Sequence, residues 1–373
     1  MNKIALLISG GVDSAVACYQ LVSHGITPDL WYIKIGADED ETLTCTAEED
    51  IEMASAVAHK FGLKLNIIDL HNEYWDKVVG YTMDHVKRGL TPNPDVMCNQ
   101  FIKFGAFIDR VGHQYDRIAS GHYATIYRGD NPDTAVMETL DNYIELTGKI
   151  WLGSAADPIK DQTDFLCTLN EFQMSKIMLP IGHMQKSDVR AIADEQHLAP
   201  AKRKDSQGIC FLGKINYNNY IESYLGKKEG NIRNYDNDGE IIGKHNGYWF
   251  HTIGQRRGLQ LSGGPWYVVA KDIEHNDVYV TRNQINLDTN IIKLNKSSEI
   301  WFNDYDKNRL NNQQEHVKIR IRHTSHPVDG TLCFQLHNVI TNNNLHGVAP
   351  GQFAVIYNWN GRIVLGSAEI SID

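Results

Sequence analysis

The stretch Ser9-Gly10-Gly11-Val12-Asp13-Ser14 follows an apolar run, residues 4–8, and precedes a segment of helical periodicity, residues 14–24. Its two glycines permit a sharp turn that a ligand can approach closely. The free N–H groups of the following helix and its positive dipole end point to the same place, which favours an anion. An ordinary strand-to-helix turn would explain the glycine pair, but the whole hexapeptide, with a hydroxyl at each end, indicates a phosphate-binding loop. Its spacing fits neither a Walker loop nor a dinucleotide-binding fingerprint.

Short apolar runs alternate with helical patterns up to residue 212. The runs cover 30–35, 65–70 and 117–120, and the helical patterns cover 47–61 and 73–87. This order predicts a Rossmann-like α/β domain, a parallel sheet with helices on both faces. The polar segment 128–158 does not fit this pattern, and we interpret it as an insertion or a hairpin.

After residue 212 the helical patterns nearly vanish. Short alternating segments follow one another between Gly and Asn turns, a pattern typical of all-β structure. We therefore predict three parts: the α/β domain at 1–213, a small middle β module at 214–284, and a C-terminal β-barrel at 285–373.

The net charge of −10 argues against a polyanionic partner, but the charge is unevenly distributed. Residues 1–200 carry 16 Lys and Arg against 29 Asp and Glu, whereas residues 201–373 carry 20 against 17. Eight of the acids lie in one run, Asp38–Glu52, which we interpret as a solvated loop or a docking site for a basic partner. The net charge therefore does not exclude nucleic acid.

The six cysteines, at 18, 45, 98, 167, 210 and 333, contain no C-x-x-C pair. That spacing does not suggest a zinc site or a secreted disulfide framework, and we expect no protein-only metal site. No signal-peptide pattern or membrane-length apolar stretch is present, so we expect a cytoplasmic protein without a membrane partner.

Cys98 follows two prolines, Pro92 and Pro94, which predict a rigid extended loop leading into a helix at 99–111. A thiol at a helix N-terminus has its thiolate favoured by the dipole, and Asp95 could serve as a local acid or base. The alternative is that Cys98 is a small buried apolar residue.

A second candidate cysteine, Cys210, follows the basic cluster Lys202-Arg203-Lys204. These cations could stabilise a thiolate or persulfide, or contact phosphates. The alternative is a solvated charge run beside a core cysteine.

These stretches resemble known families. The hexapeptide is similar to the PP-loop of ATP pyrophosphatases. The motifs PNPDxxCNxxIKF, from Pro92 to Phe104, and KDSxGICFxG, from Lys204 to Gly213, resemble the bacterial tRNA-specific 2-thiouridylase family. Further matches run in the family's order along nearly the whole chain: Gly121-His122-Tyr123, Lys160-Asp161-Gln162, residues 251–259 (HTIGQRRGL) and Ala349-Pro350-Gly351-Gln352.

The resemblance implies a reaction. ATP, with Mg²⁺, adenylates the C2 oxygen of the wobble uridine in the tRNAs for Lys, Glu and Gln, and sulfur then replaces that oxygen with release of AMP and pyrophosphate. Cys210 would carry a persulfide from a sulfur-relay protein or cysteine desulfurase. Cys98 would resolve that persulfide, with a transient disulfide between the two, and Asp95 would be the acid/base. A monomer is expected.

The resemblance also implies contacts. ATP would be held by the PP-loop, Ile33 and Gly121. Contacts to tRNA would come from Asn93, Pro94, Asp95, His122, Lys160, Asp161, Gln162, Arg256, Arg320, Ile321, Arg322 and Gln352. Lys318, Arg320 and Arg322 alternate along one predicted strand, which indicates a basic stripe on one face or a solvent-facing edge. Gln207, Ile35 and Asp164 depart from the family's usual residues.

Two other functions remain open on the residues alone. A different adenylating PP-loop enzyme, such as an amidotransferase-type synthetase, would need no paired cysteines. A non-catalytic RNA-binding protein would carry the PP-loop as a relic.

Overall fold

The computed structural model describes residues 2–35, 47–205, 217–306, 314–323 and 326–372. Cys210, Gln207 and the predicted boundary at 213/214 lie outside these residues, and so does the first part of the acidic run. Among the described residues, no helix combines the length and apolar character needed to span a bilayer.

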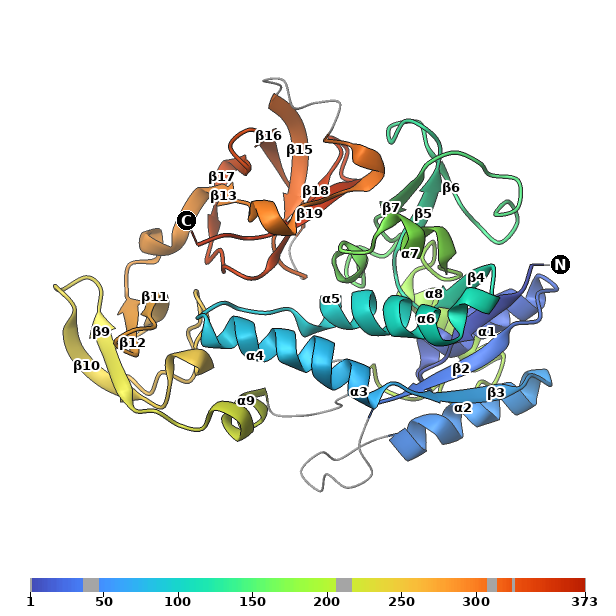
Figure 1. Ribbon diagram of the computed structural model, residues 1–373, viewed down its shortest axis with the longest axis horizontal. Coiled ribbons are helices and arrows are strands. Elements are labelled where there is room, and N and C mark those ends of the chain that lie inside the picture. The colour runs from blue at the N-terminus through green and yellow to red at the C-terminus, as the bar shows by residue number, and fades with distance from the viewer. Residues whose placement is uncertain (1, 36–46, 206–216, 307–313, 324–325, 373) are drawn as a thin grey trace.

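The N-terminal domain is built on a parallel sheet of five strands (Figure 1). The strands are β1 (Ile4–Leu7), β2 (Asp29–Lys34), β3 (Leu65–Asp69), β4 (Arg117–Ser120) and β8 (Ile177–Met178), in the order β3-β2-β1-β4-β8. Every neighbouring pair is parallel. The predicted α/β architecture is confirmed.

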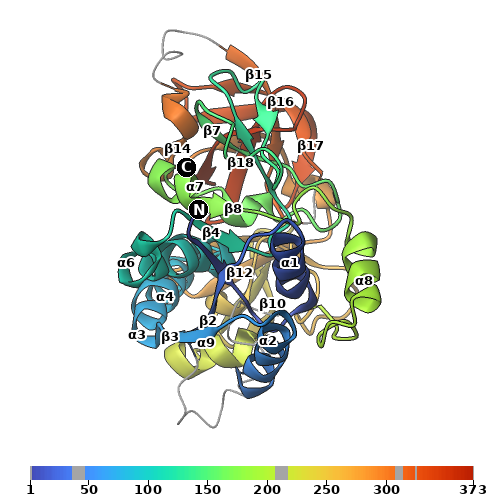
Figure 2. The same ribbon diagram turned by 90° about the vertical axis from the view of Figure 1, so that its right-hand side faces the viewer.

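Helices cover both faces of this sheet, as Figure 2 shows. The reason is visible in β1, where Ile4 and Leu6 pack into one apolar cluster and Ala5 and Leu7 into another. Successive side chains of a strand point to opposite faces, so an uninterrupted apolar strand needs cover on both. One face carries α1 (Val12–Ser23), α2 (Ala47–Phe61) and α8 (Lys186–Glu195).

The other face carries two long helical stretches. The first comprises α3 (His71–Tyr74), a π-helical segment (Trp75–Val79) and α4 (Gly80–Lys87); the second comprises α5 (Pro94–Cys98), a π-helical segment (Asn99–Ala106) and α6 (Phe107–Arg110). The second stretch corrects a prediction, because the helix begins at Pro94 and not after Cys98. Asn93 is its N-cap and accepts a hydrogen bond from the Val96 N–H (3.4 Å), while proline is well suited to the first helical position.

The polar segment after residue 125 forms a small antiparallel sheet and confirms the hairpin interpretation. Its strands are β5 (Thr125–Arg128), β6 (Val136–Met137) and β7 (Ile150–Gly153), in the order β6-β5-β7. An isolated bridge from Gly153 to Ile363 joins it to the C-terminal barrel. The short helix α7 (Glu171–Lys176) follows, with a capping box between Asn170 and Gln173.

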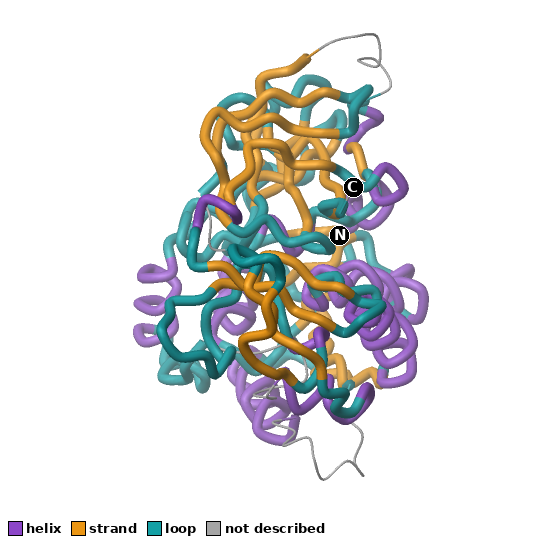
Figure 3. The backbone as a smooth tube through the Cα atoms, turned by 90° about the vertical axis from the view of Figure 1, so that its left-hand side faces the viewer, coloured by secondary structure: helices purple, strands orange, loops and turns teal. Residues whose placement is uncertain are grey.

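The middle module begins with the helix α9 (Tyr217–Leu225), which was not predicted from the sequence. Its sheet comprises β9 (Gly230–Asn234), β10 (Glu240–His245), β11 (Tyr267–Asp272) and β12 (Asp277–Thr281), in the order β10-β9-β12-β11. Figure 3 shows the strands of the barrel gathered above this module.

The C-terminal part is an antiparallel seven-stranded sheet in the order β13-β17-β16-β15-β18-β19-β14. Its strands are β13 (Asp288–Lys293), β14 (Ile300–Trp301), β15 (Gln314–Arg320), β16 (Val328–Cys333), β17 (Asn338–His346), β18 (Phe353–Tyr357) and β19 (Val364–Glu369). A bridge between Leu294 and Ile370 joins the ends of β13 and β19 and closes the barrel. The predicted barrel is confirmed.

Candidate active site

The PP-loop lies between the end of β1 and the start of α1. Gly10 has a φ of 71°, and a Cβ placed on it would lie 2.4 Å from the backbone oxygen of Asp50 in α2. Gly10 is therefore required by both the turn and the close helix. Ser14 Oγ donates to the Gly11 carbonyl (3.0 Å) and accepts from the Ser9 N–H (3.2 Å), which closes the loop on itself. Gly11 at the N-cap has no side chain to cap the helix, so the first turn of α1 faces outward as an anion site.

Two further predicted nucleotide residues flank the loop. Gly121 follows β4, and a Cβ there would lie 2.7 Å from the Ser14 backbone nitrogen. The absence of a side chain lets the end of β4 approach the start of α1. Ile33 lies on β2 with its side chain buried in the core. If this residue contacts a nucleotide, the contact therefore comes from its backbone.

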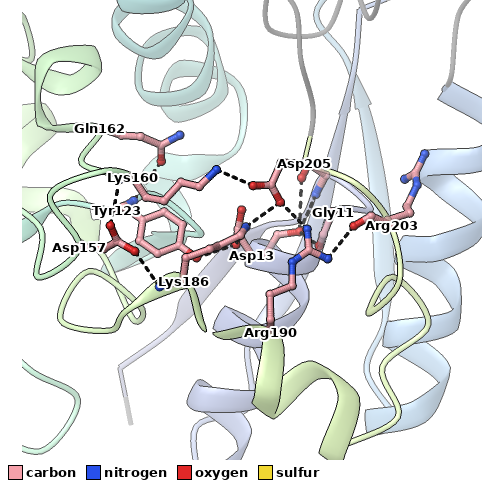
Figure 4. Close-up of polar contacts among 12 residues, drawn as sticks. Gly11, Asp13, Tyr123, Asp157, Lys160, Gln162, Lys186, Arg190, Arg203 and Asp205 are labelled. Carbon is pink, nitrogen blue, oxygen red and sulfur yellow. Dashed lines mark hydrogen bonds and ion pairs between the residues drawn. The ribbon is translucent and has the colours of Figure 1, made fainter. Parts of the chain in front are cut away.

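A cluster of ions surrounds Asp13, the acid of the PP-loop (Figure 4). Its Oδ1 accepts hydrogen bonds from the Tyr123 hydroxyl (2.8 Å) and from Lys186 Nζ (2.6 Å). Lys186 also pairs with Asp205 (2.9 Å), which in turn pairs with Lys160 (2.6 Å) and Arg190. Lys160, Lys186 and Arg190 thus converge beside the loop on two carboxylates, Asp13 and Asp205.

Arg203 connects the PP-loop to α2. Its guanidinium donates to the Gly10 carbonyl (3.0 Å) and pairs with Asp50 (2.6 Å) and Glu49 (3.3 Å). These two acids belong to the run interpreted as a solvated loop or docking site. For Glu49 and Asp50 the loop interpretation is wrong, because they lie in the first turn of α2 and pair with Arg203, while the docking site stays a prediction.

The loop carrying Lys160, Asp161 and Gln162 is tied to the same place. The Asp157 carboxylate accepts from the backbone N–H groups of residues 159 (2.9 Å), 160 (3.1 Å) and 186 (2.9 Å). Burial disfavours the Asp157 charge, but these hydrogen bonds lower its pKa below the usual value. Gln162 exchanges two hydrogen bonds with the Tyr123 backbone (2.7 and 3.0 Å). The loop is therefore tied to the segment that carries Gly121 and His122.

Arg320 does not lie on an exposed basic stripe, which corrects the prediction. Its side chain is 3% exposed and pairs with Asp164 (2.7 Å) and Asp161 (3.4 Å). Lys318 pairs with Asp329 (3.1 Å), and Arg322 donates to the carbonyls of residues 346 and 347. Alternation along β15 placed Lys318 and Arg320 on one face, but the Arg320 end of that face packs against the N-terminal domain. Ile321 is also buried.

Asp164, one of the departures from the family, now has a partner. Besides Arg320, it contacts His323 (3.1 Å), whose ring stacks on Phe165 with 4.4 Å between centroids. An aromatic residue at 164 could not supply this charge. The buried group Asp161, Asp164 and Arg320 joins the N-terminal domain to the barrel.

Gln352 holds the proline-rich loop from the barrel side. Its Nε2 donates to the carbonyls of Thr91 (2.8 Å) and Pro92 (3.1 Å), and the Thr91 N–H donates to the Pro350 carbonyl (2.8 Å). These bonds set the entry to α5, where Asn93, Pro94 and Asp95 lie half-buried. Gln352 thus acts on this loop.

Cys98 lies in the core with no exposed surface, among Val96, Met97 and Ile102. The neighbouring Asn99 donates to the carbonyls of Asp95 (3.1 Å) and Phe165 (3.2 Å) and fixes this turn. A thiol without exposed surface reacts only with a group already packed against it or after a rearrangement. Its position inside the helix also differs from the predicted N-terminal one.

His122 is buried between Ser120 Oγ (2.9 Å from Nδ1) and Lys103 Nζ (3.4 Å from Nε2). Burial and the Lys103 charge lower its pKa well below the usual value, so the ring is neutral at pH 7. Arg256 is exposed in a loop of the middle module, and a Cβ placed on nearby Gly254 would lie 3.3 Å from Gly347 Cα of the barrel.

Lys186, Arg190, Tyr123 and Asp205 were not singled out from the sequence. A signal exists for the two cations, because Lys186 and Arg190 are four residues apart at the start of the helix that follows β8. Parallel strands end at one edge, so cations near the start of that helix are expected close to the PP-loop. Asp205 lay unrecognised within the motif KDSxGICFxG.

Comparison with known proteins identifies the family. Three family models match in succession: a tRNA methyl transferase HUP domain at residues 2–214, a tRNA methyl transferase PRC-barrel domain at 218–282 and an aminomethyltransferase beta-barrel domain at 293–370. The tRNA-specific 2-thiouridylase MnmA of Parabacteroides distasonis is 48% identical over 371 residues, covering 99% of this chain and 98% of the relative. MnmA of Porphyromonas gingivalis (48%) and MnmA 1 of Bacteroides thetaiotaomicron (47%) each cover 99% of both chains. With this identity along nearly its whole length, the chain belongs to the tRNA-specific 2-thiouridylase family.

Proposed function

We propose that this protein catalyses ATP-dependent 2-thiolation of the wobble uridine of the tRNAs for Lys, Glu and Gln. The observation that carries the proposal is the PP-loop with Lys160, Lys186 and Arg190 converging beside it, in a chain that belongs to this family. Residues 1–213 form the catalytic domain, 214–284 the tRNA-contacting module and 285–373 the barrel.

In the proposed first step the PP-loop and the neighbouring cations hold the β- and γ-phosphates of ATP. The C2 oxygen of the uridine attacks the α-phosphorus, and pyrophosphate leaves. This converts a poor leaving group, a carbonyl oxygen, into AMP. The hydrogen bonds that Lys186 and Tyr123 make to Asp13 keep the acid of the loop in place during this step.

In the second step the terminal sulfur of a Cys210 persulfide attacks C2, and AMP leaves with the oxygen. The Cys98 thiolate attacks the inner sulfur of Cys210, and the bond to the transferred sulfur breaks. The products are 2-thiouridine and a Cys98–Cys210 disulfide, which a thiol reductant must reopen. Asp95 acts as the acid/base.

Substrate contacts are proposed for three groups. Asn93, Pro94 and Asp95 meet the target base, which an anticodon loop presents at little unstacking cost. His122, Lys160, Asp161 and Gln162 border the nucleotide and the base. Arg256, Arg320, Ile321, Arg322 and Gln352 serve tRNA binding, with Arg320 and Gln352 acting through the segments that they hold.

Mg²⁺ is proposed to arrive with the triphosphate, since this ion commonly binds phosphates plus one or two carboxylates. Asp13 is the carboxylate placed for that role. Among the described residues, no three His, Cys, Asp or Glu side chains form a metal-binding group. A sulfur-relay protein or cysteine desulfurase supplies sulfur, and the protein acts as a cytoplasmic monomer.

The test is mass spectrometry of tRNA nucleosides after incubation with ATP, Mg²⁺ and a persulfide donor. We expect a uridine that has exchanged oxygen for sulfur, together with stoichiometric AMP and pyrophosphate. A methylated nucleoside, which the description of the matching family as a tRNA methyl transferase suggests, would contradict thiolation. ATP cleavage without tRNA modification would favour another adenylating enzyme, and tRNA binding without cleavage a non-catalytic protein.

The cysteine roles have their own test. Cys98→Ser and Cys210→Ser should each reduce 2-thiouridine formation below detection with the persulfide donor. Cys333→Ser, in the barrel, is the matched control and should retain wild-type activity. Full activity of either of the first two variants contradicts the roles assigned to these sulfurs.

A further inference from the structure

Asp205 occupies a position where a phosphate group would be expected. One oxygen contacts Lys186 Nζ (2.9 Å) and Arg190, and the other contacts Lys160 Nζ (2.6 Å). Lysine and arginine recognise carboxylate and phosphate oxygens by the same charge-assisted hydrogen bonds. Figure 4 shows the three cations converging on this carboxylate next to the PP-loop.

The cluster is directly connected to the loop that receives the nucleotide. Lys186 Nζ is shared between Asp205 and Asp13, so one ammonium group separates Asp205 from the first turn of α1. A polyphosphate seated on the PP-loop would meet the same ammonium group. Asp205 and the nucleotide therefore draw on the same cation.

Asp205 is ionised at neutral pH, and its ion pairs are accessible to anions from solvent. Partial burial disfavours the ionised form, but the hydrogen bonds from Lys160, Lys186 and Arg190 lower the pKa of Asp205 below its usual range. The side chains of Asp205 and Arg190 are each 29% exposed and Lys160 is 39% exposed. An anion from solvent can reach such a cluster without unfolding the domain.

We infer that Asp205 is an internal competitor of the nucleotide, an acidic side chain that occupies the polyphosphate-binding cations until ATP displaces it. The inference rests on the proposed use of ATP. Without an anion, Lys160, Lys186 and Arg190 would repel one another, so the carboxylate stabilises the nucleotide-free enzyme. ATP must give up part of its binding free energy to replace it.

The experiment measures binding of Mg²⁺-ATP and, separately, of inorganic pyrophosphate to the full-length protein by isothermal titration calorimetry. Asp205→Asn keeps the shape and removes the charge. It should bind both ligands about tenfold more tightly than wild type, the size expected when one charge-assisted contact no longer has to be given up. Asp205→Glu, which keeps the charge, should remain closer to wild type.

Asp188→Asn is the matched control. Asp188 is exposed on α8 between Lys186 and Arg190 in the chain and takes no part in the cluster, so its loss tests the general effect of one charge. Circular dichroism melting of each variant confirms folding. If Asp205→Asn binds no more tightly than Asp188→Asn, or more weakly than wild type, the inference is wrong and Asp205 only positions the cations. If no variant and no wild-type protein binds either ligand, the proposed use of ATP itself is wrong.

Discussion

Two clusters of carboxylates and cations begin on neighbouring residues, Lys160 and Asp161, and they differ in their access to water. Lys160 leads to Asp205 and the PP-loop, where the ions are partly exposed. Asp161 leads to Arg320 of the barrel, where the side chains are 3–8% exposed. One loop thus takes part in both clusters. We call Lys160, Asp205, Lys186 and Arg190 the open cluster. We call Asp161, Asp164 and Arg320 the closed cluster.

The difference indicates two uses of the same chemistry. A partly exposed ion pair contributes little stability, and its anion can be exchanged for another. A buried pair is costly to break, because the remaining charge has no solvent to stabilise it. We therefore assign the open cluster to ligand binding and the closed cluster to joining the two domains.

The largest predicted effect comes from the closed cluster. Arg320→Met leaves Asp161 and Asp164 buried without their cation and should lower the free energy of unfolding by about 3–5 kcal/mol. Lys318→Met, on the same face of β15 but paired with the half-exposed Asp329, should cost less than about 1 kcal/mol. Urea denaturation monitored by circular dichroism measures both. Equal losses in the two variants would show that burial does not separate the clusters.

An intermediate effect is expected from pH. The folded pKa of Asp205 is lowered, so its contribution to stability is present above the unfolded value of about 3.9 and is lost as pH falls further. Because its ion pairs are partly exposed, Asp205→Asn should be less stable than wild type by about 1 kcal/mol at pH 7. The two stability curves should begin to converge below about pH 4 and should meet only as the pH falls through the lowered folded pKa of Asp205. A gap that does not narrow at all between about pH 5 and pH 2 would mean that the Asp205 charge is not its cause.

The smallest predicted effect is that of Lys160→Met. Lys160 is the most exposed cation of the open cluster, and its loss should cost less than about 1 kcal/mol at low salt. At about 1 M salt the difference should disappear, because exposed charges are then screened over a few ångströms. Thermal melts of wild type and variant at the two salt concentrations test this. A loss of stability that is the same at both salt concentrations would show that the Lys160 ion pair is shielded from solvent like those of the closed cluster.

The parts predicted correctly from the sequence depend on neighbours along the chain. The alternation of strands and helices and the Ser9–Ser14 loop are local patterns, and so are the turns of the barrel. Tyr217–Leu225 was missed as a helix although its apolar residues have a helical period. The start of α5 was misplaced because Pro94 was read as ending extended chain rather than as beginning a helix.

The parts that could not be predicted depend on contacts between distant residues. Lys186 meets Asp13 across 173 positions, and Arg320 meets Asp164 across 156. The two-residue period of a strand predicts which residues share a face. It does not predict whether that face meets water or another domain. For this reason Arg320 was predicted on the surface, and Lys186 and Arg190 were overlooked.

The hydrogen bonds from Gln352 to the proline-rich loop affect the order in which parts of the chain can fold during protein synthesis. Gln352 is joined to the nascent chain 261 residues after Thr91. At about 5–20 residues per second, the loop waits tens of seconds on the ribosome before the side chain that holds it exists. The parallel sheet can fold during this time, but the entry to α5 still lacks the hydrogen bonds from Gln352. The PP-loop can therefore form well before the entry to α5 gains its hydrogen bonds from Gln352.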